Sequence, residues 1–145
     1  MNRRLIILLC IFSNLLLGNG IIYWWASSSA SINWDLMIGM SLSCVLCYLF
    51  IFKYINFKSW NIIKLMFFSI FTCVVIELIG CSFASVVTGL KKEESDYFFD
   101  TLKGLGIGFF LGIMGNILMF PITITMGVLN LFWFRKFQKS LALEY

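Results

Sequence analysis

Residues 65–90 read LMFFSIFTCVVIELIGCSFASVVTGL, and they contain one acidic or basic side chain, that of Glu77. At 1.5 Å per residue this stretch makes a helix of roughly 39 Å, which is longer than the hydrocarbon layer of a bilayer at about 30 Å. It is therefore predicted to be a transmembrane helix. A second apolar stretch, residues 104–116, carries a glycine every few positions. The rest of the fold is predicted starting from these two stretches.

The composition of the whole chain agrees with a membrane protein. Of the 145 residues, 61% are hydrophobic and 18% are aromatic, and the mean hydropathy is +0.94. A soluble domain is about one quarter charged, whereas this chain is 12% charged. We expect residues 1–145 to form a single integral-membrane domain, since four spans with short connections use nearly the whole length.

An all-α bundle of four transmembrane helices is predicted, at about residues 5–26, 36–54, 65–90 and 103–134. The first span follows a short basic start, as the core of a cleaved signal peptide also would. An aromatic belt typical of a membrane interface closes this span at residues 23–25, and small residues follow only after it. We therefore expect the first span to be retained, with cleavage as the alternative.

The fourth apolar run, residues 102–134, is too long for one span perpendicular to the membrane, because ~32 residues reach about 48 Å. Pro121 lacks a backbone N–H, so we expect a long fourth helix that is kinked near this residue. Thr123 or Thr125 would then satisfy a freed carbonyl. Two full spans are not expected, because the piece after Pro121 is too short.

Basic residues are distributed unevenly between the two sides of this arrangement. Three fall on one side: Lys91, Lys92 and Lys103. The others fall on the opposite side: Arg3, Arg4, Lys53, Lys58, Lys64, Arg135, Lys136 and Lys139. Because cytoplasmic loops are enriched in Lys and Arg, we expect both termini to be cytoplasmic, in a bacterial inner membrane. The net charge of +4 is assigned to topology and to contact with membrane lipids, not to nucleic acid.

Small residues indicate how the third and fourth helices pack. Gly104, Gly108 and Gly112 recur every four residues, and Gly115 and Asn116 continue the same stripe. A surface of this kind, a glycine zipper, allows the backbones of two helices to approach closely. We therefore expect the fourth helix to pack tightly against a neighbour.

The third helix offers a matching face, made of Glu77, Gly80, Ala84 and Thr88. In an antiparallel register the two faces meet in these pairs: Thr88 with Gly104, Ala84 with Gly108, Gly80 with Gly112, and Glu77 with Gly115 and Asn116. A carboxylate is costly in a bilayer, so we expect Glu77 to be largely protonated and hydrogen-bonded to Asn116. The pair of faces is either a packing device alone or the wall of a site for a proton, a cation or a cationic group.

Signatures of catalysis are scarce. The chain has no His, and its acidic residues form no H-E-x-x-H motif or phosphate-binding loop, so no enzyme, metal or cofactor is predicted. Cys44 and Cys47 form a C-x-x-C pair in the second span, and in this respect the chain resembles the quinone-linked disulfide oxidases. That family carries a second cysteine pair in its second outer loop, whereas residues 91–103 contain no Cys. Redox activity is therefore not expected.

Two functions fit these features. The first is non-enzymatic binding of another protein in the membrane, as an immunity protein against a membrane-acting toxin or as an accessory subunit of a complex. The connection before the fourth helix offers an outward epitope: Glu93, Glu94, Asp96, Tyr97, Phe98 and Asp100. The second is a small oligomeric transporter or channel that uses Glu77 and Asn116.

Overall fold

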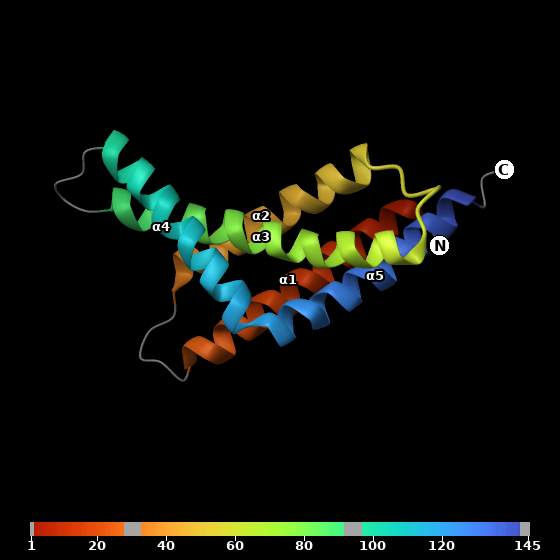
Figure 1. The fold of residues 1–145 in the computed structure, drawn as a ribbon, viewed down its shortest axis with the longest axis horizontal. Helices are drawn as coiled ribbons and strands as arrows, with labels where there is room; N and C mark the ends of the chain where they lie inside the picture. Colours follow the sequence, from red (N-terminus) through yellow and green to blue (C-terminus); the bar gives the residue numbers. More distant parts are fainter. Residues whose placement is uncertain (1, 28–32, 92–96, 143–145) are drawn as a thin grey trace.

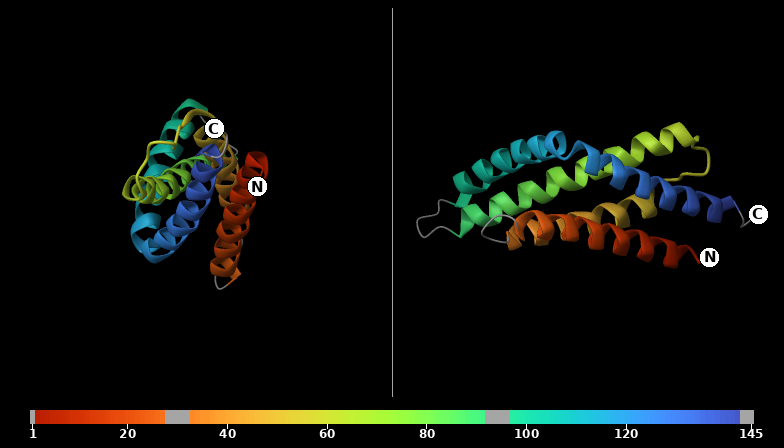
Figure 2. Two further views of the ribbon diagram at one scale, coloured as in Figure 1. Left: turned by 90° about the vertical axis from the view of Figure 1, so that its right-hand side faces the viewer. Right: turned by 90° about the horizontal axis from the view of Figure 1, so that it is seen from below.

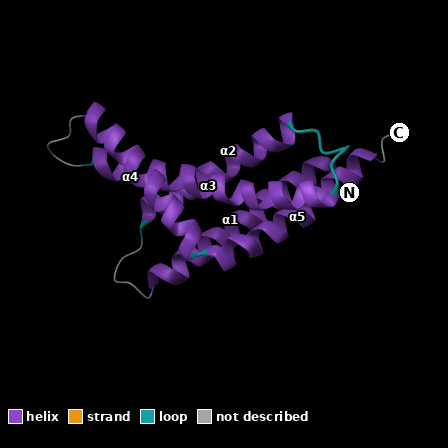
Figure 3. Ribbon diagram, viewed as in Figure 1, coloured by secondary structure: helices purple, strands orange, loops and turns teal. Residues whose placement is uncertain are grey.

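The chain folds into helices joined by short connections, as the computed structural model in Figure 1 shows. The structure describes residues 2–27, 33–91 and 97–142. These residues form α1 (Arg3–Ser27), α2 (Trp34–Tyr54), α3 (Ile62–Leu90), α4 (Tyr97–Leu118) and α5 (Phe120–Ala142). Among them Figure 3 marks helix and loop but no strand. Helices α1 to α4 are long and apolar enough to cross a membrane, which confirms the predicted all-helical class.

Two asparagine side chains fix where α2 and α3 begin. Asn33 Oδ1 accepts a hydrogen bond from Leu36 N at 3.0 Å, and Asn61 Oδ1 accepts one from Lys64 N at 2.9 Å. Each bond satisfies one of the backbone donors that the first turn of a helix leaves without a partner. The short connection between α2 and α3 is thereby held to residues 55–61.

The predicted fourth helix is two helices in the structure. α4 and α5 lie on either side of Met119, and the chain changes direction between them (Figure 1). Met119 N donates to Gly115 O at 2.8 Å, and the next backbone bonds run from Ile122 N and Thr123 N to Met119 O at 2.8 and 3.0 Å. Pro121 has no N–H with which to continue the ladder. The helix therefore ends and starts again where the sequence predicted a kink.

The threonines after the break do not fill the role that the sequence suggested. Thr123 Oγ1 donates to Met119 O at 3.3 Å, and Thr125 Oγ1 donates to Pro121 O at 2.8 Å. The carbonyl that a proline at position 121 frees is the one four residues earlier, on Ile117. Thr125 thus bonds within α5, and Thr123 bonds to Met119 at the break; neither reaches Ile117 O.

Helix α3 is the centre of the bundle. It packs against α2, α4 and α5, whereas α1 packs against α2 and α5. No close contact joins α1 to α4 within the described ranges. The right-hand view of Figure 2 accordingly shows α1 and α4 on opposite sides of the molecule, with α3 between them.

The two ends of the bundle differ in charge. The start of α1, the end of α5 and the α2–α3 connection lie at one end, and the end of α1, the start of α2, the end of α3 and the start of α4 lie at the opposite end (Figure 1). The segments that meet at the first end, which we call the terminal end, contain these basic residues: Arg3, Arg4, Lys53, Lys58, Lys64, Arg135, Lys136 and Lys139. Lys91 follows the end of α3 and Lys103 lies near the start of α4, so both belong to the opposite end. The grouping of basic residues inferred from the sequence is thus also a grouping in space.

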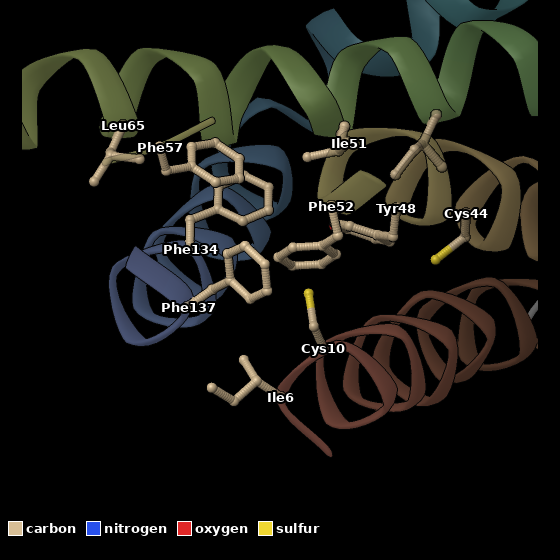
Figure 4. Packing of buried hydrophobic residues seen from close by; sticks show 11 residues of the cluster. Ile6, Cys10, Cys44, Tyr48, Ile51, Phe52, Phe57, Leu65, Phe134 and Phe137 are labelled. Carbon is tan, nitrogen blue, oxygen red and sulfur yellow. The ribbon is translucent and has the colours of Figure 1, made fainter. Parts of the chain in front are cut away.

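An aromatic cluster fills the terminal half of the bundle. Tyr48, Phe52, Phe57, Phe134 and Phe137 are all buried there, and Figure 4 shows them converging from α2, α5 and the α2–α3 connection. The ring of Phe57 is fully buried, with its centroid 5.2 Å from that of Phe134 and 6.4 Å from that of Phe52. The rings thus pack against one another between α2, α5 and the α2–α3 connection.

Candidate functional site

Three glycines bring α4 into close contact with α3. A Cβ atom added at Gly104 would lie 2.8 Å from Val86 Cα, and one at Gly112 would lie 3.0 Å from Leu78 Cα. A Cβ at Gly108 would overlap the backbone of Ser82. Because these neighbours are backbone atoms, no larger side chain fits without separating the helices. We call this contact the α3–α4 seam.

The register of the seam differs from the one proposed from the sequence. Gly80 and Ala84 do not face α4: a Cβ at Gly39 of α2 would lie 2.6 Å from Gly80 O and 3.4 Å from Ala84 N. Gly80 in turn faces Met40, whose Cα would be 3.0 Å from an added Cβ. The small-residue face of α3 therefore packs on α2. The glycines of α4 occupy a neighbouring face, two residues out of the predicted register.

Glu77 lies where α3 passes Gly115 of α4. A Cβ atom at Gly115 would overlap Glu77 Oε1, and it would lie 3.5 Å from the carboxyl carbon. The sequence pattern placed these two residues together, but it also placed Asn116 on the carboxyl group. Asn116 Nδ2 instead donates to Gly112 O at 2.9 Å, and its buried Oδ1 has no hydrogen-bond partner among the described residues. The carboxyl group of Glu77 likewise makes no hydrogen bond within the described part of the chain.

A partly open cavity of about 770 Å³ lies between α1 and α4. Side chains of all five helices line it. The wall is mostly apolar, and its residues include Leu15, Ile22, Met40, Ile76, Ile107, Leu111, Ile122 and Met126. Polar groups interrupt the wall at Asn14, Asn19, Ser41, Glu77, Ser85, Thr88 and Thr123. The missing contact between α1 and α4 thus coincides with a space of the size of a small-molecule site.

The cavity runs along the half of the bundle away from the termini. At its outer end it is lined by Gly89, Asp100 and Lys103, and at its inner end by Thr123 and Met126. The break between α4 and α5 forms part of the inner wall, since Met119 also lines the cavity. Irregular backbone at membrane depth is tolerated where it lines a cavity or is buried in protein.

A buried polar network closes the inner end. Asn130 Oδ1 accepts hydrogen bonds from Tyr48 Oη at 2.6 Å and from Asn14 Nδ2 at 2.8 Å. Asn130 Nδ2 donates to Cys73 Sγ at 3.0 Å. One fully buried side chain of α5 therefore links α1, α2 and α3. The sequence did not indicate this network, because neither Asn130 nor Tyr48 lies in a recognisable motif.

Further polar contacts hold the wall helices in place. Asn19 Nδ2 donates to Ser41 Oγ at 2.9 Å, which ties α1 to α2 beside the cavity. At the outer end Lys91 Nζ forms an ion pair with Asp35 Oδ1 at 2.6 Å, and this pair joins α2 to α3. Among the residues that the structure describes, no hydrogen bond crosses the cavity to α4; the side chains of Thr101 and Asn116 bond within α4.

The cysteines are free thiols in the structure. The two cysteines of the C-x-x-C pair form no disulfide with each other. Cys44 is buried, and Cys47 is half-buried. No group of three metal-ligating residues comes together in the described ranges. Cys73 and Cys81 line the cavity one turn before and one turn after Glu77. Each is four residues from Glu77, so both thiols lie on the same face of α3 as its carboxyl group.

The predicted outer epitope is only partly described. Glu93, Glu94 and Asp96 lie outside the described residues. Tyr97 and Phe98 are 73% and 70% exposed at the start of α4. Asp100 is half-buried and lines the outer end of the cavity.

Comparison with known proteins adds no family. No protein-family model, no curated protein and no solved structure matches the chain.

Proposed function

We propose that this chain is a non-enzymatic integral membrane protein that binds a small amphiphilic molecule in the cavity between α1 and α4. The cavity is the observation that supports this proposal. At about 770 Å³, the cavity has the volume of small-molecule sites.

The proposed class is a small transporter, the second of the two functions that fit the sequence. Its cavity reaches one end of the bundle, and the aromatic cluster and the Asn130 network close it towards the other end. Transport proteins bind their substrates near the middle of the membrane, commonly beside a broken helix. The break at Met119 lies beside the inner part of this cavity.

The proposed orientation follows from charge. The basic residues at the terminal end would face the cytoplasm of a bacterial cell, with both termini inside. The cavity would then reach the outer face of the inner membrane, and the basic end would contact anionic lipid headgroups.

A tryptophan at Gly18 tests the proposed function. Gly18 lines the cavity, and a Cβ atom added there meets nothing within 4 Å. Trp at this position would fill the space without moving the backbone of α1. Gly20 of the same helix also has open space around it but does not line the cavity, so Gly20→Trp is the matched control.

The measurement is native mass spectrometry of the protein extracted from its membrane in lipid particles. We expect the unmodified chain and Gly20→Trp to retain a small molecule in a fixed ratio, and Gly18→Trp to lose it. Retention of the same molecule by Gly18→Trp, or no retained molecule in the unmodified chain, would contradict the proposal.

A second candidate function is binding of another membrane protein, as an immunity protein or an accessory subunit. Its supporting observation is the exposed aromatic surface of Tyr97, Phe98 and Phe99 at the start of α4. Aromatic side chains are enriched both at protein interfaces and at membrane surfaces. Pull-down from native membranes separates the alternatives: a stoichiometric protein partner that is lost in Phe98→Ser supports this function, and a homo-oligomer without another partner opposes it.

A further inference from the structure

The charge of the cavity is asymmetric along its length. Glu77 lies in its inner part, and the other acidic and basic residues that line it, Asp100 and Lys103, lie at the outer end. Lys103 precedes Gly115, the neighbour of Glu77, by twelve residues on α4. At 1.5 Å per residue these positions are roughly 18 Å apart. Lys103 therefore cannot neutralise Glu77 directly, and the inner part has a single acidic group.

The Glu77 carboxyl group has no hydrogen-bond or ion-pair partner among the described residues. It makes no hydrogen bond within the described residues, and the amide predicted to reach it, that of Asn116, bonds to Gly112 O. The polar side chains that flank it on the cavity face of α3 are the thiols of Cys73 and Cys81, which are weak donors. An acidic group at this depth is costly unless it is paired. Positive charge in the cavity would supply the missing partner.

The surroundings select among cations. Hydrated metal ions such as Ca²⁺ bind to six or more oxygen ligands, and Mg²⁺ to an octahedral set. Here one carboxyl group lines the inner part of the cavity, and no group of three metal-ligating residues forms within the described ranges. Apolar side chains of α1, α4 and α5, among them Leu15, Leu111 and Ile122, surround the remaining space. This wall fits an apolar body attached to the charge.

We propose that the ligand of this cavity is a lipophilic organic cation, whose positive charge lies against the Glu77 carboxylate while its apolar body fills the space between α1 and α4. This inference rests on the proposed function, since it names the ligand class for the same cavity. It assigns Glu77 as the residue that selects for positive charge.

A pair of ions of one shape and opposite charge provides the probe. Tetraphenylphosphonium and tetraphenylborate are equally bulky and apolar, but one is a cation and the other an anion. Saturable binding of each is measured to the full chain in nanodiscs of phosphatidylcholine, which has no net charge. We expect the cation to bind at one site per chain, and the anion to bind at least tenfold more weakly.

Variants locate the effect. Glu77→Gln keeps the shape of the side chain and removes its charge, and we expect it to weaken binding of the cation at least tenfold. Asp35→Asn removes one negative charge outside the cavity, where Asp35 pairs with Lys91, and should change binding less than threefold. Glu77→Asp keeps the charge and should retain most of the binding.

Thiol protection gives a second measurement on the unmodified chain, which is decisive if Glu77→Gln does not fold. Cys81 lines the cavity beside Glu77, whereas the half-buried Cys47 does not line it. We expect tetraphenylphosphonium to slow alkylation of Cys81 by N-ethylmaleimide several-fold, without slowing that of Cys47. Mass spectrometry of the peptides reads each site separately.

The outcomes separate this inference from the proposed function. Equal binding of both probes, with both lost in Gly18→Trp, would overturn the preference for cations and leave the cavity as the site of function. Unchanged cation binding in Glu77→Gln would overturn the role of Glu77. Absence of cation binding and of Cys81 protection would also overturn the inference. A retained native molecule that is neutral or anionic, and that is lost in Gly18→Trp, would overturn the inference but would still support the proposed function.

Discussion

The two halves of this bundle pack their apolar helices in different ways. In the terminal half, large rings fill the space between helices, and Asn130 bonds to groups on three of them. In the other half, glycines draw α4 onto α3, and α1 stays apart. The α3–α4 seam and the cavity thus both belong to the half away from the termini.

The largest loss of stability is expected when the terminal half loses an aromatic ring. Phe57→Ala removes a fully buried side chain that contacts the rings of Phe134 and Trp60. We expect a loss of about 3–5 kcal/mol in the free energy of unfolding, as for other buried Phe-to-Ala changes. Unfolding by SDS in mixed micelles, followed by circular dichroism, measures it. Phe110→Ala, at a ring 58% exposed on α4, is the control and should cost much less.

A smaller loss is expected when the seam is overfilled. Gly108→Leu places a side chain against the backbone of Ser82 and Cys81. We expect a loss of about 1–3 kcal/mol in unfolding free energy, because the helices must separate. Gly106→Leu adds the same side chain where a Cβ meets nothing within 4 Å, and it should be nearly neutral. Equal effects of the two variants would contradict the account of the seam.

The Asn130 network of the terminal half is expected to contribute less to stability than the Phe57 ring or the close packing at Gly108. Asn130→Ala leaves Tyr48 Oη and Asn14 Nδ2 without their shared acceptor. Interhelical hydrogen bonds in membranes are worth about 1–2 kcal/mol at most, so the loss in unfolding free energy should fall in that range. Asn116→Ala removes an amide whose oxygen has no described partner, and it should cost less in the same titration.

The smallest effect on stability is expected at Glu77, the acidic residue in the inner part of the cavity. Glu77→Gln removes no described hydrogen bond, so we expect the unfolding free energy to change by about 0.5 kcal/mol or less. Stability and ligand binding would then separate at this residue. A loss as large as that of Phe57→Ala would instead make Glu77 part of the structural core.

The sequence predicted the class of fold but not the choice of partner by each helix face. Apolar runs of spanning length determine helices in a bilayer, and this explains the agreement for α1, α2 and α3. For α3, two glycine-bearing helices compete for one small-residue face. Gly39 of α2 packs on that face, and the glycines of α4 take the next one. Periodicity shows that a face is small, but it does not show which neighbour covers it.

The cavity could not be predicted, because it arises from a contact that is missing. Glu77 stood out as an acidic residue in an apolar run, yet nothing in the sequence shows that α1 and α4 stay apart. The break at Met119 was also underestimated. A proline predicts a lost hydrogen bond, while the size of the bend depends on the neighbours that hold each segment.

Gln138 gives the order in which the parts of the molecule can come together during synthesis. Its side-chain amide donates to Phe57 O and to Trp60 O, both at 2.7 Å, and so holds the α2–α3 connection from α5. Helix α5 follows the other four in the chain and also supplies Asn130 and Phe134. A ribosome must therefore deliver four helices to the bilayer before the buried amides and rings of the terminal half find their partners. Until then, the nascent chain can already form the contacts of α2 and of α4 with α3.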